Sequence, residues 1–196
     1  MVKSQVHGMV LASLFAALMA IGANITSIVP ILVVGNVPIT LQTVVCVIAG
    51  LLLGKKWGAI SMTVYMLIGL AGMPVFAGWG GGLGTLIRPT FGFILSYIIV
   101  AWFVGLLTEK HKSFAMLLTA ALLGTALNYL LGTNWMYMAY KLWFNAPEGF
   151  TYTMAWVWML PPMPKDIILS FVAAVVGAKM LQIFPQAQPS KTSVPA

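Results

Sequence analysis

Apolar residues dominate the chain in runs long enough to cross a membrane. A helix needs about 20 mostly apolar residues to cross a hydrocarbon layer about 30 Å thick. On this basis we expect six membrane-spanning helices, near residues 8–29, 38–54, 57–76, 89–108, 114–133 and 164–184. The pattern predicts an all-α integral membrane protein, a bundle of six transmembrane helices in a single domain over residues 1–184.

Two terminal segments need separate interpretation. Residues 185–196, PQAQPSKTSVPA, are rich in Pro, Ser and Gln and have no apolar period, so we expect a disordered cytoplasmic tail. The first apolar run, from Met9 to Ala23, also has the length of a signal peptide. Five further hydrophobic spans follow it, which favours an uncleaved first helix.

Composition agrees with a membrane location. The chain has 196 residues, of which 61% are hydrophobic and 7% charged, whereas an average soluble domain is about 25% charged. The single cysteine, Cys46, lies inside an apolar run and has no partner for an internal disulfide. Little sequence remains for a soluble domain, although six helices are enough to enclose a small pocket.

The positive charges predict the orientation of the helices. Loops that face the cytoplasm carry an excess of Lys and Arg. With the N-terminus inside, three basic residues lie outside, namely Arg88, Lys141 and Lys165, and seven lie on the cytoplasmic side, namely Lys3, Lys55, Lys56, Lys110, Lys112, Lys179 and Lys191. Both termini are therefore expected inside. Because the basic residues are scattered in ones and twos, the net charge of +7 does not indicate nucleic-acid binding.

Several enzyme and metal motifs are missing from the sequence. The stretch GLLLGKK, 50–56, has three residues between its glycines instead of four and no Ser or Thr after the lysines, so it is no phosphate loop. His7 and His111 have no second metal ligand at helical spacing. The only acids are Glu109, Glu148 and Asp166, which form no paired-carboxylate motif. We expect no catalytic residues, no metal and no cofactor, and any ATP would be used by another chain.

Three ionisable residues meet at the predicted outer end of the bundle: Arg88, Lys165 and Asp166. A charge at membrane depth costs about 2.5–3.5 kcal/mol on insertion scales, so each needs a partner or a wet cavity. Together they leave one positive charge in excess, which an anionic ligand would balance. The alternatives are an Arg88 that reaches lipid headgroups, an interfacial Lys165, and an Asp166 that only stabilises a helix N-terminus.

The segment PVFAGWGGGLGTLIRPTFGF, residues 74–93, combines six glycines with Arg88. Glycine adopts backbone conformations that are closed to other residues and lets other groups approach its backbone closely. These properties suit a moving gate over a pocket. They also suit a flexible extracellular loop.

Two further patterns each allow two interpretations. The aromatic residues of 134–163 form either an interfacial belt or a lid that walls a site facing outward. Ala12, Ala16 and Ala20 place small residues on one face of the first helix. That face serves either internal helix packing or contact with a partner protein.

A set of ordered motifs resembles the BioY family, the biotin-binding S components of energy-coupling-factor (ECF) transporters. The motifs are VPITLQ (37–42), LLLGKKWG (51–58), GLAGMPVFAG (69–78), the glycine run followed by PTFGF (89–93), YLLGTNW (129–135) and PKDIILS (164–170). The resemblance covers nearly the whole chain apart from its tail. It implies a subunit without covalent chemistry that captures biotin from outside and works with a transmembrane T subunit and two ATPase subunits.

The resemblance also implies roles for particular residues. Asp166 matches an Asp at the start of the family's last helix and would accept hydrogen bonds from the ureido ring of biotin. Arg88 or Lys165 would hold the biotin carboxylate. The remaining implied binding residues are Gly80, Trp79 and Gln42, and the T subunit would contact the face formed by Ala12, Ala16 and Ala20.

The chain departs from the family pattern near Asp166. Lys165 stands where relatives have Gly, and Leu169 stands where relatives have Lys. If binding were nanomolar, each of the about 16 heavy atoms of biotin would contribute about 0.8 kcal/mol, which requires an enclosed pocket. Two alternatives remain, a self-sufficient secondary transporter for biotin and a purely structural membrane subunit.

Overall fold

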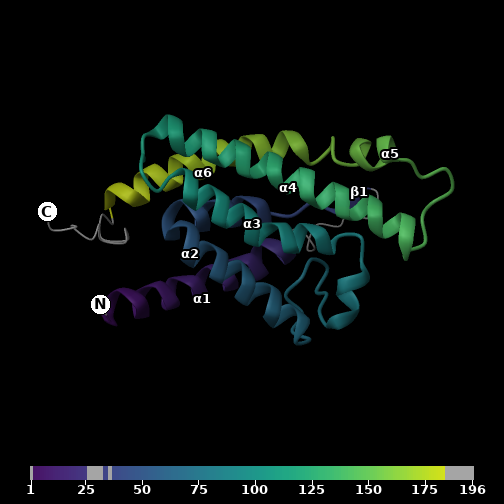
Figure 1. Ribbon diagram of the computed structural model, residues 1–196, viewed down its shortest axis with the longest axis horizontal. Coiled ribbons are helices and arrows are strands. Elements are labelled where there is room, and N and C mark those ends of the chain that lie inside the picture. The colour runs from purple at the N-terminus through teal and green to yellow at the C-terminus, as the bar shows by residue number, and fades with distance from the viewer. Residues whose placement is uncertain (1, 26–32, 35–36, 184–196) are drawn as a thin grey trace, which may run out of the picture.

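The computed structural model describes residues 2–25, 33–34 and 37–183 (Figure 1). The elements are α1 (Val2–Asn24), β1 (Val33–Val34), β2 (Val37–Pro38), α2 (Gln42–Leu70), the 3-10 helix η2 (Leu83–Ile87), α3 (Phe91–Leu107), α4 (Phe114–Leu142), α5 (Tyr152–Val157) and α6 (Met163–Ile183). The predicted helical architecture is confirmed, apart from the two-residue antiparallel pairing of β1 with β2. The predicted tail, 185–196, and the end of the first predicted span lie outside the described residues.

Helix α2 contains the break that the sequence predicted between the second and third spans. Gly54 has φ 74° and ψ 179°, which is not helical. The Gln42 side chain donates a hydrogen bond of 2.8 Å to the Tyr65 hydroxyl, although a straight helix would separate two residues this far apart in sequence by about 35 Å. The two halves of α2 therefore fold back on each other, and glycine supplies the left-handed conformation at the bend.

Small residues allow the backbones around this bend to approach closely. A methyl group built on Gly58 would lie 3.2 Å from Cα of Gly50 in the other half of α2. One built on Gly105 of α3 would lie 2.2 Å from the backbone nitrogen of Lys55. Because dispersion and close packing drive helix association in lipid, glycine at these contacts stabilises the bundle.

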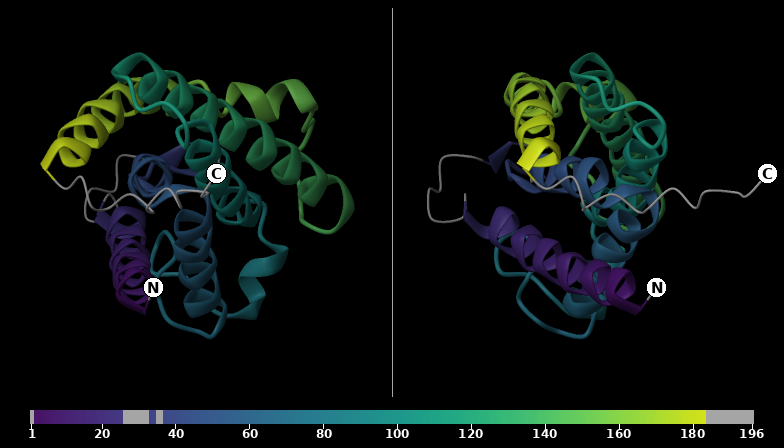
Figure 2. Two further views of the ribbon diagram at one scale, coloured as in Figure 1. Left: turned by 60° about the vertical axis from the view of Figure 1, so that its left-hand side comes forward. Right: turned by 90° about the vertical axis from the view of Figure 1, so that its left-hand side faces the viewer.

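The core lies where α2 meets α1, α3 and α6, and α4 packs against both α3 and α6. Its fully buried side chains include Met19, Tyr65, Val100, Val104 and Leu117. Figure 2 shows α1 on one side of the bundle and α4 with α6 on the other, with α2 between them. Many large apolar side chains outside this core are exposed, as expected for helices in contact with lipid.

Four helices are long and apolar enough to cross a membrane: α1 from Gln5 to Asn24, α2, α4 and α6. Helix α3 is shorter but also apolar. Helix α4 continues to Leu142 instead of ending near residue 133, so part of the expected aromatic loop is helical. Whether six segments cross the bilayer stays a prediction.

The two ends of the bundle differ in what they carry. The start of α1, the end of α6 and the turn between α3 and α4 lie at one end (Figure 1). The loop between α2 and α3, η2, β1 and α5 lie at the opposite end. The glycine-rich segment and the start of α6 are thereby placed at the same end as the aromatic segment.

The Gly105 contact makes a testable prediction about packing. Gly105→Ala should lower the free energy of unfolding by about 1–3 kcal/mol, because the new methyl group meets backbone atoms that cannot move aside. Thermal unfolding in detergent would measure the loss. Gly84→Ala is the matched control, since nothing lies within 4 Å of the added methyl group there. Equal melting temperatures for both variants would contradict the packing described.

Candidate functional site

A buried carboxylate, Asp166, lies in the first turn of α6. The residue is 5% exposed, and its Oδ2 accepts a hydrogen bond of 2.6 Å from the Tyr129 hydroxyl of α4. Its Oδ1 is also buried and lies beside the Lys165 ammonium group. A carboxylate oxygen keeps more than one acceptor position, so Asp166 is able to accept another donor.

Lys165 compensates the charge of Asp166. Its Nζ lies 2.8 Å from Oδ1 of Asp166, and the side chain is 29% exposed. The same ammonium group donates to the backbone carbonyl oxygen of Thr40. Lys165 thereby joins α6 to the segment that leads into α2, and both of its described partners are acceptors within the chain.

The capping interpretation of Asp166 does not account for these contacts. Both carboxylate oxygens are directed at side chains, Tyr129 and Lys165, in the described structure. The carboxylate still lies in the first turn of α6, where the helix dipole favours a negative charge. The dipole is an additional stabilising factor, while the side-chain contacts define the geometry.

Gln42 lies at the start of α2 and is 5% exposed. The Tyr65 hydroxyl accepts from Gln42 and donates a 3.0 Å bond to the carbonyl oxygen of Val75. Gln42 is thus engaged with Tyr65, which connects it to the first residues of the glycine-rich segment. Only Leu41 separates Gln42 from Thr40, so this chain of bonds begins next to the Lys165 contact.

A second set of buried polar groups follows α4. Asn128 accepts from the Ser96 hydroxyl of α3 at 2.7 Å and donates to the Thr43 hydroxyl of α2 at 3.4 Å. Thr133, one turn beyond Tyr129, is fully buried, and neither its hydroxyl nor the buried indole N–H of Trp135 has a hydrogen-bond partner among the described residues. Buried polar groups are normally paired, so these two are available to water or to a ligand.

Arg88 occupies a different position from the Lys165 and Asp166 pair. It follows η2, is exposed, and forms no ion pair with any described residue. Its guanidinium lies next to Gly80, with Nη1 3.8 Å from the point where a methyl group on that glycine would lie. The structure brings Arg88 and Gly80 together within the glycine-rich segment and keeps Arg88 apart from direct contact with Asp166.

Trp79 stands at the tip of the glycine-rich segment. Its side chain is 62% exposed and its backbone has φ 58°, a left-handed conformation that is uncommon for a large residue. Its backbone N–H donates a 2.8 Å hydrogen bond to the Asn24 side chain at the end of α1. The indole ring therefore projects from a backbone that is held to α1.

The aromatic segment folds back onto α4. The ring of Phe150 packs against Tyr140 of α4, at 4.7 Å between centroids, and against Trp158, at 5.2 Å. Trp143 is 45% exposed, and its indole N–H donates a 2.8 Å bond to the carbonyl oxygen of Ile87, the neighbour of Arg88. The segment thus connects with the glycine-rich loop and is more than a belt of independent rings.

The alanine stripe of α1 is used partly inside the chain. Ala12 and Ala16 are 2% and 4% exposed, and the Ser61 hydroxyl of α2 donates to the carbonyl oxygen of Ala12 at 2.7 Å. Ala12 and Ala16 therefore pack inside the chain, against α2. The prediction that all three alanines form a partner surface is at odds with the burial of Ala12 and Ala16, because small side chains let α2 cover them.

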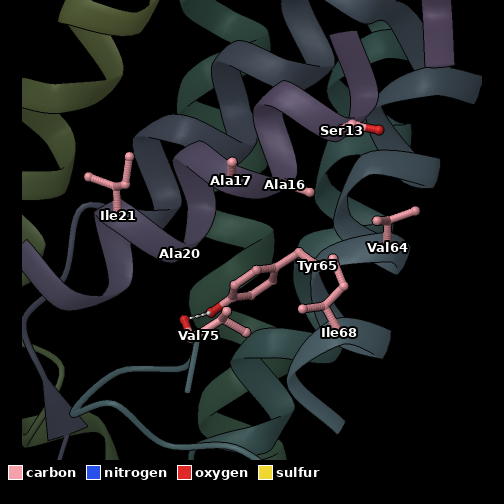
Figure 3. Close-up of a pocket in the computed structure, with 9 residues that line it drawn as sticks. All are labelled: Ser13, Ala16, Ala17, Ala20, Ile21, Val64, Tyr65, Ile68 and Val75. Atoms are coloured by element: carbon pink, nitrogen blue, oxygen red, sulfur yellow. Dashed lines mark hydrogen bonds between the residues drawn. The ribbon is translucent and has the colours of Figure 1, made fainter. Parts of the chain in front are cut away.

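A groove of about 370 Å³ lies between α1 and the second half of α2 (Figure 3). Figure 3 shows the Tyr65 ring within it, with the hydroxyl bonded to Val75. The groove does not contain Asp166, Lys165 or Arg88, and its lining is mostly apolar: Ser13, Ala16, Ala17, Ala20, Ile21, Val64, Tyr65, Ile68 and Val75. It is distinct from the polar site, although both involve Tyr65.

Sequence reasoning missed Tyr129 and Tyr65. Both are polar positions inside long apolar helices, and Tyr129 begins the segment YLLGTNW, in which Thr133 follows one turn later on the same face. The spacing of these two polar residues on one helix face was a sequence signal for a polar site on α4. The partnership of Tyr65 with Gln42 was not accessible, because it depends on the fold-back at Gly54.

Comparisons with known proteins agree on one family. A model of the BioY family matches residues 1–186. The chain is 45% identical over 180 residues to the putative biotin transporter BioYB of Bacillus subtilis, covering 89% of each protein. It is 33% identical over 173 residues to the biotin transporter BioY of Thermotoga maritima, covering 88% of this chain and 94% of that protein.

A solved structure has the same fold. It is described as the S-component for biotin from an ECF-type ABC transporter, and it covers 92% of this chain and 93% of its own length with a TM-score of 0.76. The sequence identity is 22%, so this likeness establishes the arrangement of the helices.

The Lys165 and Asp166 pair gives a prediction about stability. Lys165→Met should lower the free energy of unfolding by about 1–3 kcal/mol, because a buried carboxylate loses its counter-ion. Lys165→Met with Asp166→Asn should lose less than the sum of the single variants. Thermal unfolding in detergent measures all three.

Lys55→Met is the control for this prediction, because the Lys55 and Glu109 pair is exposed, at 43% and 48%. An exposed pair contributes about 0–1 kcal/mol. If Lys165→Met were no more harmful than Lys55→Met, the buried pair would not have the role described.

Proposed function

The chain belongs to the BioY family, and from this premise we propose that it is the membrane subunit that captures biotin for uptake into the cell. Members of this family are transporters and not enzymes, and the chain is a multi-pass membrane protein. The observation that carries the proposal is the buried Asp166 carboxylate, held by Lys165 and Tyr129, whose oxygens each keep a further acceptor position for a ligand donor.

Asp166 recognises the ureido ring of biotin. This ring has two N–H donors, and a carboxylate is the strongest acceptor that a side chain offers them. In the low-polarity interior, such a charge-assisted bond gains strength because water does not compete for it. Lys165 stays with Asp166 and balances its negative charge, while its exposed portion remains near the ligand.

Arg88 holds the valerate carboxylate of biotin. Both described contacts of Lys165 are made within the chain, with Asp166 and Thr40. Arg88 is exposed and forms no ion pair among the described residues, so its guanidinium is available for a bidentate contact. Gly80 beside it has no side chain, which leaves room for the ligand.

The loops at this end of the bundle enclose the ligand. Trp79 and the aromatic segment over α4 supply apolar surface for the sulfur-containing ring and the aliphatic chain of biotin. The start of α1 and the end of α6 lie at the opposite end of the bundle (Figure 1). With the excess of lysines there, this arrangement supports six spans, both termini in the cytoplasm and a pocket that opens outward.

Energy for transport comes from partner subunits. The structural neighbour is a component of an ECF-type ABC transporter, and we propose that this chain likewise works with a transmembrane T subunit and two ATPase subunits. The groove between α1 and α2 offers the T subunit a mostly apolar surface that includes Ala20. The alternative is a self-sufficient secondary biotin transporter.

The assignment of the two cations predicts a distinct ligand response. Biotinamide lacks the negative charge of biotin, so calorimetry on the wild type should show weaker binding of the amide, by about 10–100-fold for one lost charged contact. Arg88→Ala should weaken binding of biotin but leave binding of biotinamide nearly unchanged. Asp166→Asn should weaken the binding of biotin and of biotinamide by the same factor.

Lys141→Ala is the matched control, since Lys141 is another exposed cation at the end of α4. Unchanged biotin affinity in both Arg88→Ala and Asp166→Asn would contradict the assigned site. If Lys165→Met, and not Arg88→Ala, removed the preference for biotin over biotinamide, Lys165 would hold the carboxylate.

Uptake assays distinguish the two transport mechanisms. Radiolabelled biotin should enter proteoliposomes only when the chain is reconstituted with the T and ATPase subunits and ATP is supplied. Binding without uptake is expected for the chain alone. Biotin accumulation by the chain alone, driven by an ion gradient, would contradict the proposed dependence on partner subunits.

A further inference from the structure

Asn24, the last residue of α1, ties that helix to the glycine-rich segment. It is 3% exposed. Its Oδ1 accepts a 2.8 Å hydrogen bond from the backbone N–H of Trp79, and its Nδ2 donates to the carbonyl oxygen of Val75 at 3.3 Å. One side chain thus contacts this segment at two points.

The part of the segment between those two points is a tight hairpin. Phe76 and Gly80 exchange backbone hydrogen bonds of 3.0 and 3.1 Å. Gly78 and Trp79 at its tip have φ values of 70° and 58°. Glycine adopts such a conformation readily, but a residue with a Cβ atom does so at a cost in free energy. The bond from Trp79 to Asn24 offsets that cost.

The same segment is joined to the candidate binding site. The carbonyl oxygen of Val75 accepts from both Asn24 and the Tyr65 hydroxyl, and Tyr65 in turn accepts from Gln42. Gly80, at the far side of the hairpin, lies beside the Arg88 guanidinium. A change at Asn24 would therefore alter the position of a hairpin that is linked to Gln42 through Tyr65 and that lies beside Arg88.

We propose that Asn24 is a positioning residue that holds the hairpin of residues 75–80 in its closed place beside the binding site, so that the end of α1 controls how readily this loop opens. The proposal rests on the proposed function for the identity of the ligand, biotin. The attachment of the hairpin to α1 follows from the contacts of Asn24 alone. Its two bonds would break together when the loop moves away from α1.

Asn24 also donates to the carbonyl oxygen of Ala20, one turn earlier in α1, at 3.0 Å. This bond belongs to the helix end alone. Ser13 makes a bond of the same kind to the carbonyl oxygen of Met9, and a serine at position 24 is able to do so as well. Asn24→Ser therefore retains a bond to Ala20 while removing the reach to the loop.

The test is hydrogen exchange of the purified full chain in detergent without ligand. Asn24→Ala and Asn24→Ser should both speed exchange of the amides in residues 75–82 by about tenfold, the effect expected for one or two net hydrogen bonds. Exchange in α3 and α4 should stay unchanged. Ser13→Ala is the matched control, because it removes a local bond on the same helix away from the loop.

The binding readout is the rate at which bound radiolabelled biotin is released, which should rise about tenfold in both Asn24 variants. If the loop of Asn24→Ser exchanged at the wild-type rate, Asn24 would only stabilise the end of α1, and the proposal would be overturned. Faster exchange throughout the bundle would also overturn it. If the wild type failed to bind biotin but the loop still responded, the proposed function would fail while the role of Asn24 would stand.

Discussion

The buried carboxylate of Asp166 is the constraint around which one end of the bundle is organised. A negative charge in a low-polarity interior requires compensation. Tyr129 and Lys165 supply it, and they belong to α4 and to α6 itself. Because Lys165 also bonds to the carbonyl of Thr40, the segment before α2 is fixed by the same charge. Three parts of the chain therefore depend on one ionised group.

From that group a line of hydrogen bonds extends across the bundle to the other side. It runs from Thr40, whose hydroxyl accepts from the backbone N–H of Gln42, through the Gln42 side chain to Tyr65 and on to the glycine-rich segment at Val75. It ends at Asn24, whose side chain closes the tip of the hairpin. The glycine-rich loop, which the sequence allowed as either a gate or a flexible loop, is thus attached to the bundle at Val75 and Trp79. Gly78 supplies the positive φ of its tight turn.

Much of this arrangement could be predicted from the sequence. The apolar runs predicted the helices. The interruption at Gly54, Lys55 and Lys56 predicted a break where α2 folds back on itself. Asp166 was predicted as a binding residue because a charged side chain is rare at the end of an apolar membrane helix. The resemblance to the BioY family named the same residue, and the comparisons confirmed that family. The binding roles of the individual residues stay predictions.

Other features required the three-dimensional structure, because they depend on which helix lies opposite a given face. A stripe of alanines has the same spacing whether it meets α2 or another protein, and only the structure shows that Ala12 and Ala16 are buried inside the chain. The most direct test of the account is a solid-state NMR measurement in lipid between ¹³Cγ of Asp166 and the ureido nitrogens of ¹⁵N-labelled biotin. The account predicts a distance under about 4 Å, as a hydrogen bond from nitrogen to carboxylate requires; bound biotin without any such contact would contradict it.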